Sequence, residues 1–107
     1  MGLVLPLRLP RRTGTIHLCD ESLSASNIHA NYLAKVDLAN SPENGDLAAV
    51  VVNGELLVRY FWRTENGCIH LAPANPDYPV KCVQANRVFI IGRILETYAV
   101  KASTAGL

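Results

Sequence analysis

Two apolar runs joined by Asn53-Gly54 constrain the fold of this chain more than any other feature. The first run ends at Val52, the second begins at Glu55, and both contain many β-branched or aromatic residues. A two-residue hairpin turn of type I′ needs a positive φ at both central positions, which asparagine and glycine tolerate. The sequence therefore predicts an antiparallel hairpin, with a charged residue, Arg59, near the middle of its second strand.

Similar short runs recur along the chain, and no segment has a sustained period of 3.6 residues. The serine-rich stretch 21–27 predicts one helical turn at most. Gly92 lies inside the last and longest run, where it predicts a bend or bulge. The expected strands are Thr15–Cys19, Tyr32–Leu38, Asp46–Val52, Glu55–Trp62, Cys68–Ala72, Val80–Val83 and Arg87–Val100. Seven such strands predict a mainly β fold, a compact and strongly bent sheet or partly open barrel.

Length and composition limit the class of protein. A chain of 107 residues, 50% hydrophobic, forms one domain with a core of its own. A net charge of +1 gives no reason to expect direct nucleic-acid binding. The three cysteines lack C-x-x-C spacing, so we expect reduced, buried thiols and neither a metal nor a cofactor. No apolar run approaches the roughly 20 residues that span a membrane, which favours a soluble, cytoplasmic protein.

The ends of the chain differ from its middle. Residues 1–13 carry Arg8, Arg11 and Arg12 among prolines, and we expect a flexible basic arm there. Residues 14–101 are expected to form the β domain, and residues 102–107 a frayed tail.

A proline-framed loop, LAPANPDYP at residues 71–79, is the most specific motif. Together with Gly45-Asp46, Gly54-Glu55 and the Ile90-Ile91-Gly92 segment, it resembles the C-terminal peptidase domain of the LexA repressors and UmuD mutagenesis proteins, the S24 serine peptidases. The resemblance covers residues 16–100 and is closer to the UmuD branch. It implies the bent β fold of the signal-peptidase type.

That family uses a serine nucleophile and a lysine base, and the resemblance places Ser22 at the serine position and Arg59 at the lysine position. A buried lysine can be neutral and take the serine proton. An arginine stays protonated and has no free lone pair. We therefore expect Arg59 to hydrogen-bond Ser22, or to pair with Asp20 or Glu21, and the peptidase chemistry to be lost.

The resemblance also implies partners. Members of the family form homodimers through this domain, and the UmuD branch engages a Y-family translesion DNA polymerase and the RecA filament in the SOS response to DNA damage. The leading interpretation is a dimerisation and partner-binding module, with self-association at an exposed edge of the last strand. Two alternatives stay open. One is an active autopeptidase that uses Ser22 with an unorthodox base, drawn from Lys35 or the histidines at 17, 29 and 70. The other is a phage or plasmid accessory protein that binds a host LexA or UmuD subunit.

Overall fold

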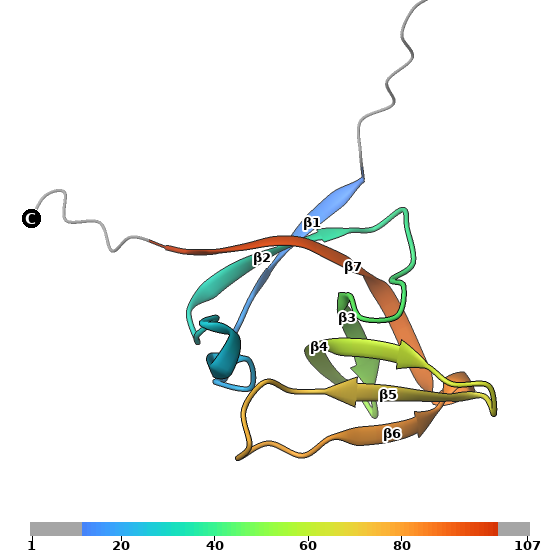
Figure 1. The fold of residues 1–107 in the computed structure, drawn as a ribbon. Coiled ribbons are helices and arrows are strands. Elements are labelled where there is room, and N and C mark those ends of the chain that lie inside the picture. Colours follow the sequence, from blue (N-terminus) through green and yellow to red (C-terminus); the bar gives the residue numbers. More distant parts are fainter. Residues whose placement is uncertain (1–11, 101–107) are drawn as a thin grey trace, which may run out of the picture.

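The computed structural model describes residues 12–100, which form one open antiparallel sheet of seven strands (Figure 1). The strand order is β1-β2-β7-β3-β4-β5-β6. The strands are β1 (Thr13–His17), β2 (Tyr32–Asp37), β3 (Leu47–Val52), β4 (Glu55–Arg63), β5 (Cys68–Ala72), β6 (Lys81–Gln84) and β7 (Val88–Ala99). The predicted mainly β fold is confirmed, and each strand end lies within two residues of the expected one.

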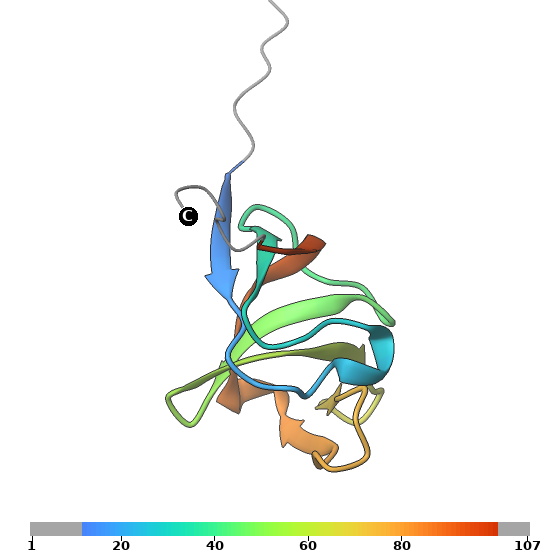
Figure 2. The same ribbon diagram turned by 90° about the vertical axis from the view of Figure 1, so that its left-hand side faces the viewer.

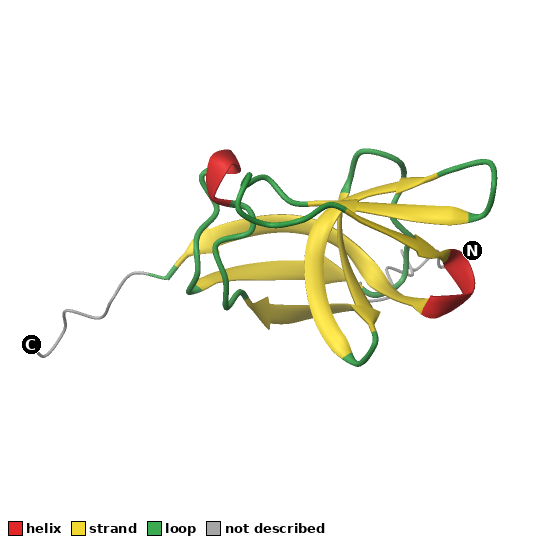
Figure 3. Cartoon of the chain, turned by 90° about the horizontal axis from the view of Figure 1, so that it is seen from below, coloured by secondary structure: helices red, strands yellow, loops and turns green. Residues whose placement is uncertain are grey.

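Two short 3-10 turns complete the fold, η1 (Ser24–Ser26) and η2 (Ala85–Arg87), at opposite ends of the molecule in Figure 3. The first confirms the single helical turn expected in residues 21–27, and it ends at Asn27 with a φ of 65°. The predicted hairpin turn is also present, because Asn53 has a φ of 52° and Gly54 a φ of 78°.

The long strand β7 joins two halves of the sheet. Its first part pairs with β3 and its second part pairs with β2, and Arg93 is a partner of both. An extra residue interrupts each ladder, Ile91 on the β3 side and Leu95 on the β2 side. Because a bulge bends and twists a strand, β1 and β2 turn away from the plane of β3–β6 (Figures 1 and 2). The predicted irregularity at Gly92 is thus confirmed next to that residue.

Gly92 permits a close approach between the two halves. A Cβ atom at this position would lie 2.0 Å from the carbonyl oxygen of Asp37 and 3.1 Å from a methyl group of Val36. Only glycine, which has no side chain, allows the backbone of β2 to lie this close to β7.

Each half has its own apolar cluster, and β3 contributes to both. Alternate residues of a strand point to opposite faces, so Val50 packs in one cluster and Ala49 in the other. The first cluster consists of Ala48, Val50, Val52, Leu57, Phe61, Ile69 and Leu71. The second consists of Leu18, Leu23, Ala34, Val36, Ala49 and Val58. The continuous apolar run of β3 reflects this burial on both faces.

The expected burial of the cysteines was wrong. Cys19 and Cys82 are exposed and Cys68 is half-buried, all as free thiols. Cys19 lies in the loop after β1, and Cys82 lies on β6, an outer strand of the sheet, so solvent reaches both.

The domain boundaries fall largely outside the described residues. Of the expected arm 1–13, the structure describes Arg12 and Thr13, and Thr13 already belongs to β1. The expected tail 102–107 lies outside the described part. Within residues 12–100, no helix has the length and apolar character needed to cross a membrane.

We predict that Gly92→Ala lowers the free energy of unfolding by at least about 2 kcal/mol, because the new methyl group forces the backbones of β7 and β2 apart. Urea denaturation measures this loss. The matched control is Gly14→Ala, whose Cβ would meet only side-chain atoms at 3.6 Å and should change stability by less than about 1 kcal/mol. Equal losses in the two variants would contradict the close-approach argument.

Candidate functional site

Ser22 and Arg59 meet in a buried contact between the loop after β1 and the middle of β4. The Arg59 guanidinium donates from Nη1 to the Ser22 hydroxyl at 2.8 Å and to the Val58 carbonyl at 2.9 Å. Ser22 is 1% exposed and Arg59 is 5% exposed. The structure thus brings together the two residues singled out in the sequence, and the expected hydrogen bond between them is present.

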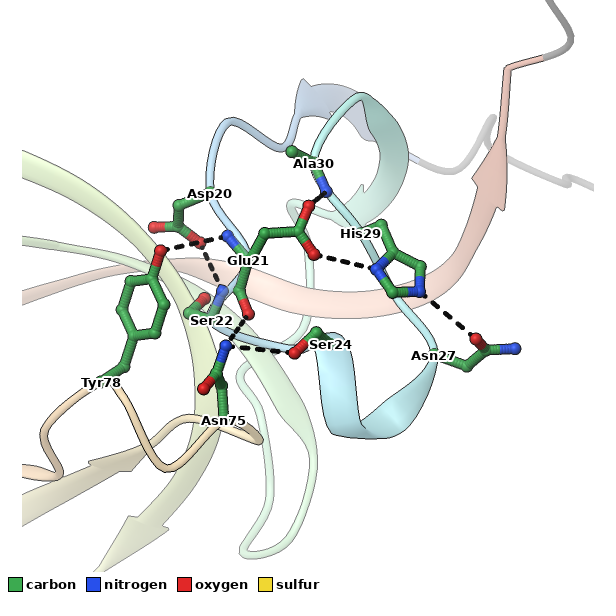
Figure 4. Close-up of polar contacts among 9 residues, drawn as sticks. All are labelled: Asp20, Glu21, Ser22, Ser24, Asn27, His29, Ala30, Asn75 and Tyr78. Carbon is green, nitrogen blue, oxygen red and sulfur yellow. Dashed lines mark hydrogen bonds and ion pairs between the residues drawn. The ribbon is translucent and has the colours of Figure 1, made fainter.

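Asp20 is the carboxylate nearest to this contact. Its Oδ2 lies 3.9 Å from Nη2 of Arg59. Its Oδ1 accepts a hydrogen bond of 3.0 Å from the Ser22 backbone N–H, which Figure 4 shows. Burial by itself would raise the pKa of Asp20, but the hydrogen bonds from Ser22 and the charge of Arg59 outweigh it and hold the pKa below its ordinary value of 3.8. Asp20 therefore keeps its negative charge beside the arginine.

Glu21, the other acid expected near Arg59, forms its contacts with His29 and Ala30. Its carboxylate contacts His29 Nδ1 at 2.9 Å and accepts from the Ala30 backbone N–H at 2.8 Å (Figure 4). The His29 contact and the Ala30 N–H lower the pKa of Glu21. Glu21 thus closes the loop between β1 and β2, and the pairing expected between it and Arg59 is replaced by one with His29.

The proline-framed loop, residues 71–79, holds the Ser22 segment in place. The Ala74 N–H donates to the Ser22 carbonyl at 2.7 Å, and the Ala74 carbonyl accepts from the Ala25 N–H at 2.6 Å. The Asn75 amide donates to the Glu21 carbonyl at 2.8 Å and to the Ser24 hydroxyl at 3.1 Å (Figure 4). These bonds join two loops that lie about 50 residues apart in the sequence.

Tyr78, in the proline-framed loop, contacts both the Ser22 segment and the guanidinium of Arg59. Its hydroxyl accepts from the Glu21 N–H at 3.2 Å, and the Cζ of Arg59 lies 5.9 Å from the centre of its ring. At that distance an aromatic face attracts a guanidinium. Asn75 and Tyr78 are site residues that the sequence analysis had used only to identify the loop. The sequence signal that could have identified them was an amide side chain and an aromatic ring held between prolines.

A cavity of about 140 Å³ opens beside the contact. Its polar side includes Asp20, Ser22 and Arg59, together with His17 and Cys19. Its apolar side is formed by Ile16, Leu18, Leu23, Leu56 and Val58. The cavity is therefore lined by aliphatic side chains together with a buried positive charge, that of Arg59.

The four residues considered as alternative bases for Ser22 lie in different parts of the structure. Lys35 pairs on β2 with Thr15 and Glu96 and does not line the cavity. His29 is held by Glu21, and His70 lies 3.5 Å from the sulfur of Cys82. His17 does line the cavity, but among the described residues it makes no hydrogen bond to Ser22.

The arrangement can orient a hydroxyl and bind an anion, but the group next to Ser22 cannot accept its proton. A guanidinium is a donor only, and its bond to the Ser22 oxygen occupies a lone pair that a nucleophile would use. Within the described residues, the contact is thus a binding geometry and not a proton-transfer pair.

Comparison with known families finds that residues 5–95 match the sequence profile of a family described as Peptidase S24-like. The match covers most of the chain and includes both Ser22 and Arg59. The comparison with curated proteins finds no match.

We predict that Asp20→Asn is destabilising at neutral pH, by less than about 1 kcal/mol because Asp20 is half-exposed. The folded state lowers the pKa of Asp20, so the stabilising charge is present above 3.8 and is lost as the pH falls through the lower folded-state value. The difference between variant and wild type should therefore disappear toward pH 2. Urea denaturation at several pH values measures this stability difference. A difference that persists at pH 2 would show that the negative charge of Asp20 is not its source.

Proposed function

The chain belongs to the Peptidase S24-like family, and from this premise we propose that it is a UmuD-like member that has lost serine peptidase activity. It keeps the fold as a dimerisation and partner-binding module in the cytoplasm, where it assists a translesion DNA polymerase in the response to DNA damage. The observation that carries the proposal is the buried hydrogen bond of 2.8 Å from Arg59 to Ser22.

Chemistry supports the loss of catalysis. A serine hydroxyl becomes nucleophilic when a neighbouring group removes its proton. The family supplies a lysine at this place, whereas Arg59 stays protonated and donates to the serine oxygen. The remaining contacts of the site, from Ala74, Asn75 and Tyr78, hold the Ser22 segment and do not depend on catalysis. A fold of this kind can therefore lose its reaction and keep its surface.

The shape of β7 supports self-association. Residues 94–99 pair with β2 on one side, and no strand lies on their other side in the described part of the chain. This free edge carries Tyr98, which is 43% exposed. Figure 1 shows the last part of β7 (red) beside β2. An unpaired edge next to an apolar side chain can pair with a second copy.

We predict that a fluorophosphonate probe, which phosphonylates an activated serine with release of fluoride, leaves the wild-type protein unmodified. Arg59→Lys should gain a detectable adduct at alkaline pH, because burial can keep a lysine neutral. Intact-mass spectrometry measures the adduct, and Arg59→Lys combined with Ser22→Ala is the control that should lose it. An adduct on wild-type Ser22, absent in Ser22→Ala, would overturn the proposal in favour of an active peptidase.

We further predict that light scattering at micromolar concentration gives twice the chain mass of 11.7 kDa. Tyr98→Lys should reduce dimer stability at least about tenfold, because it places a charge on the free edge of β7. The matched control is Trp62→Lys, which changes an aromatic residue of similar exposure (40%) on β4. A monomeric wild-type protein would contradict self-association and favour an accessory protein that binds a host LexA or UmuD subunit.

A further inference from the structure

Two free thiols lie on one face of the neighbouring strands β5 and β6 (Figure 1). Cys82 on β6 is paired with His70 on β5. Cys68, two residues before His70, is paired with Gln84, two residues after Cys82. Paired residues and alternate residues of a strand share a face, so Cys68 and Cys82 are diagonal neighbours. The opposite face of β5 packs in the first apolar cluster, and the thiols are on the outer face.

A histidine accompanies the exposed thiol. The sulfur of Cys82 lies 3.5 Å from Nε2 of His70, and this nitrogen accepts the thiol proton when it is unprotonated. Local desolvation of the sulfur and the neighbouring thiol of Cys68 raise the pKa of Cys82 above its ordinary value of 9.0. Because the thiolate is the nucleophile and the thiol is not, Cys82 needs such a proton acceptor at neutral pH.

The two thiols act on each other without being bonded. Cys68 affects the pKa of Cys82, which requires a short separation, and both are free thiols. The Cβ atoms of diagonal neighbours lie up to about 7–8 Å apart, whereas a disulfide needs about 4 Å. Strand β6 must therefore shift by about 3 Å to close the bond. It has four residues and lies at the end of the strand order, so few ladder hydrogen bonds resist the shift.

We propose that Cys68 and Cys82 are a redox modification site, at which a small-molecule disulfide such as oxidised glutathione produces a cross-strand disulfide. His70 takes the proton of Cys82, and the resulting thiolate attacks one sulfur of the oxidant. A mixed disulfide forms, and one glutathione thiolate leaves. The thiolate of Cys68 then attacks the sulfur of Cys82 and releases the second glutathione. Two electrons pass from the protein thiols to the small disulfide, and the two thiol protons end on the released glutathione thiolates.

The position of the two cysteines favours a reversible bond. The shift of β6 strains the disulfide, and strained, exposed disulfides are easily reduced. In a reducing compartment such labile bonds serve as redox sensors. The bond also encloses residues 69–81, which include the proline-framed loop that holds the Ser22 segment. Oxidation therefore constrains this loop through the two strands that carry it.

The test is mass spectrometry of the reduced wild-type protein after incubation with millimolar oxidised glutathione. The Cys68–Cys82 bond, identified by peptide mapping, should exceed mixed disulfides at these two cysteines at least about tenfold. The reason is that a neighbouring thiol has a higher effective concentration than free glutathione. Dithiothreitol should restore all three thiols. Stable mixed disulfides without the Cys68–Cys82 bond, or no reaction of either thiol, would overturn the proposal.

Serine variants assign the two steps. Cys68→Ser should trap glutathione on Cys82, because no second thiol remains to release it. The matched control is Cys19→Ser, which changes the exposed cysteine in the loop after β1 and should still form the cross-strand bond. Loss of the bond in Cys19→Ser would contradict the pairing of Cys68 with Cys82.

A variant of His70 tests the proton transfer. In the Cys68→Ser background, His70→Gln should slow the trapping of glutathione at least about tenfold at neutral pH. The control is His17→Gln, an exposed histidine on β1, which should leave the rate unchanged. Equal rates with and without His70 would overturn its role as proton acceptor. The outcome does not depend on the proposed loss of catalysis, because neither Ser22 nor Arg59 takes part.

Discussion

The close contact between Gly92 and the Asp37 carbonyl is the constraint on which the rest of the structure depends. It lets β7 pass across β2 at the point where its pairing changes from β3 to β2. The bend turns a single sheet into two halves with separate apolar clusters. In this bent sheet the loop after β1 reaches β4, where Ser22 and Arg59, 37 residues apart in the sequence, form a hydrogen bond.

A buried arginine is costly unless its charge is compensated, and the site compensates it only in part. Ser22 and Val58 accept hydrogen bonds, the ring of Tyr78 adds its negative face, and Asp20 supplies a distant negative charge. The proline-framed loop keeps these groups in position, because its Ala74 N–H and Asn75 side-chain amide donate to the main-chain carbonyls of Ser22 and Glu21. A guanidinium held in this way stays protonated and cannot act as a base.

Local patterns predicted the fold well. The hairpin at Asn53-Gly54, the seven strands and the irregularity near Gly92 each depend on neighbouring residues or on a two-residue period. The errors concern contacts with distant parts of the chain. Cys82 was expected to be buried, but it lies on an outer strand. Asp20 and Glu21 were equivalent candidates for an ion pair with Arg59. Only the path of the loop decided that Asp20 lies near Arg59 and that Glu21 contacts His29.

The sequence by itself determined the strands, the turns and the chemical identity of the groups at positions 22 and 59. It also determined that the residue at position 59 cannot take a proton, because that property belongs to the arginine side chain itself. The tertiary structure decided that Arg59 donates to Ser22 and that Asn75 and Tyr78 support the site. It also decided that, within residues 12–100, β5 pairs with only the second half of β4. These features depend on where β5 ends and how sharply β7 bends, and both result from packing between segments far apart in the chain.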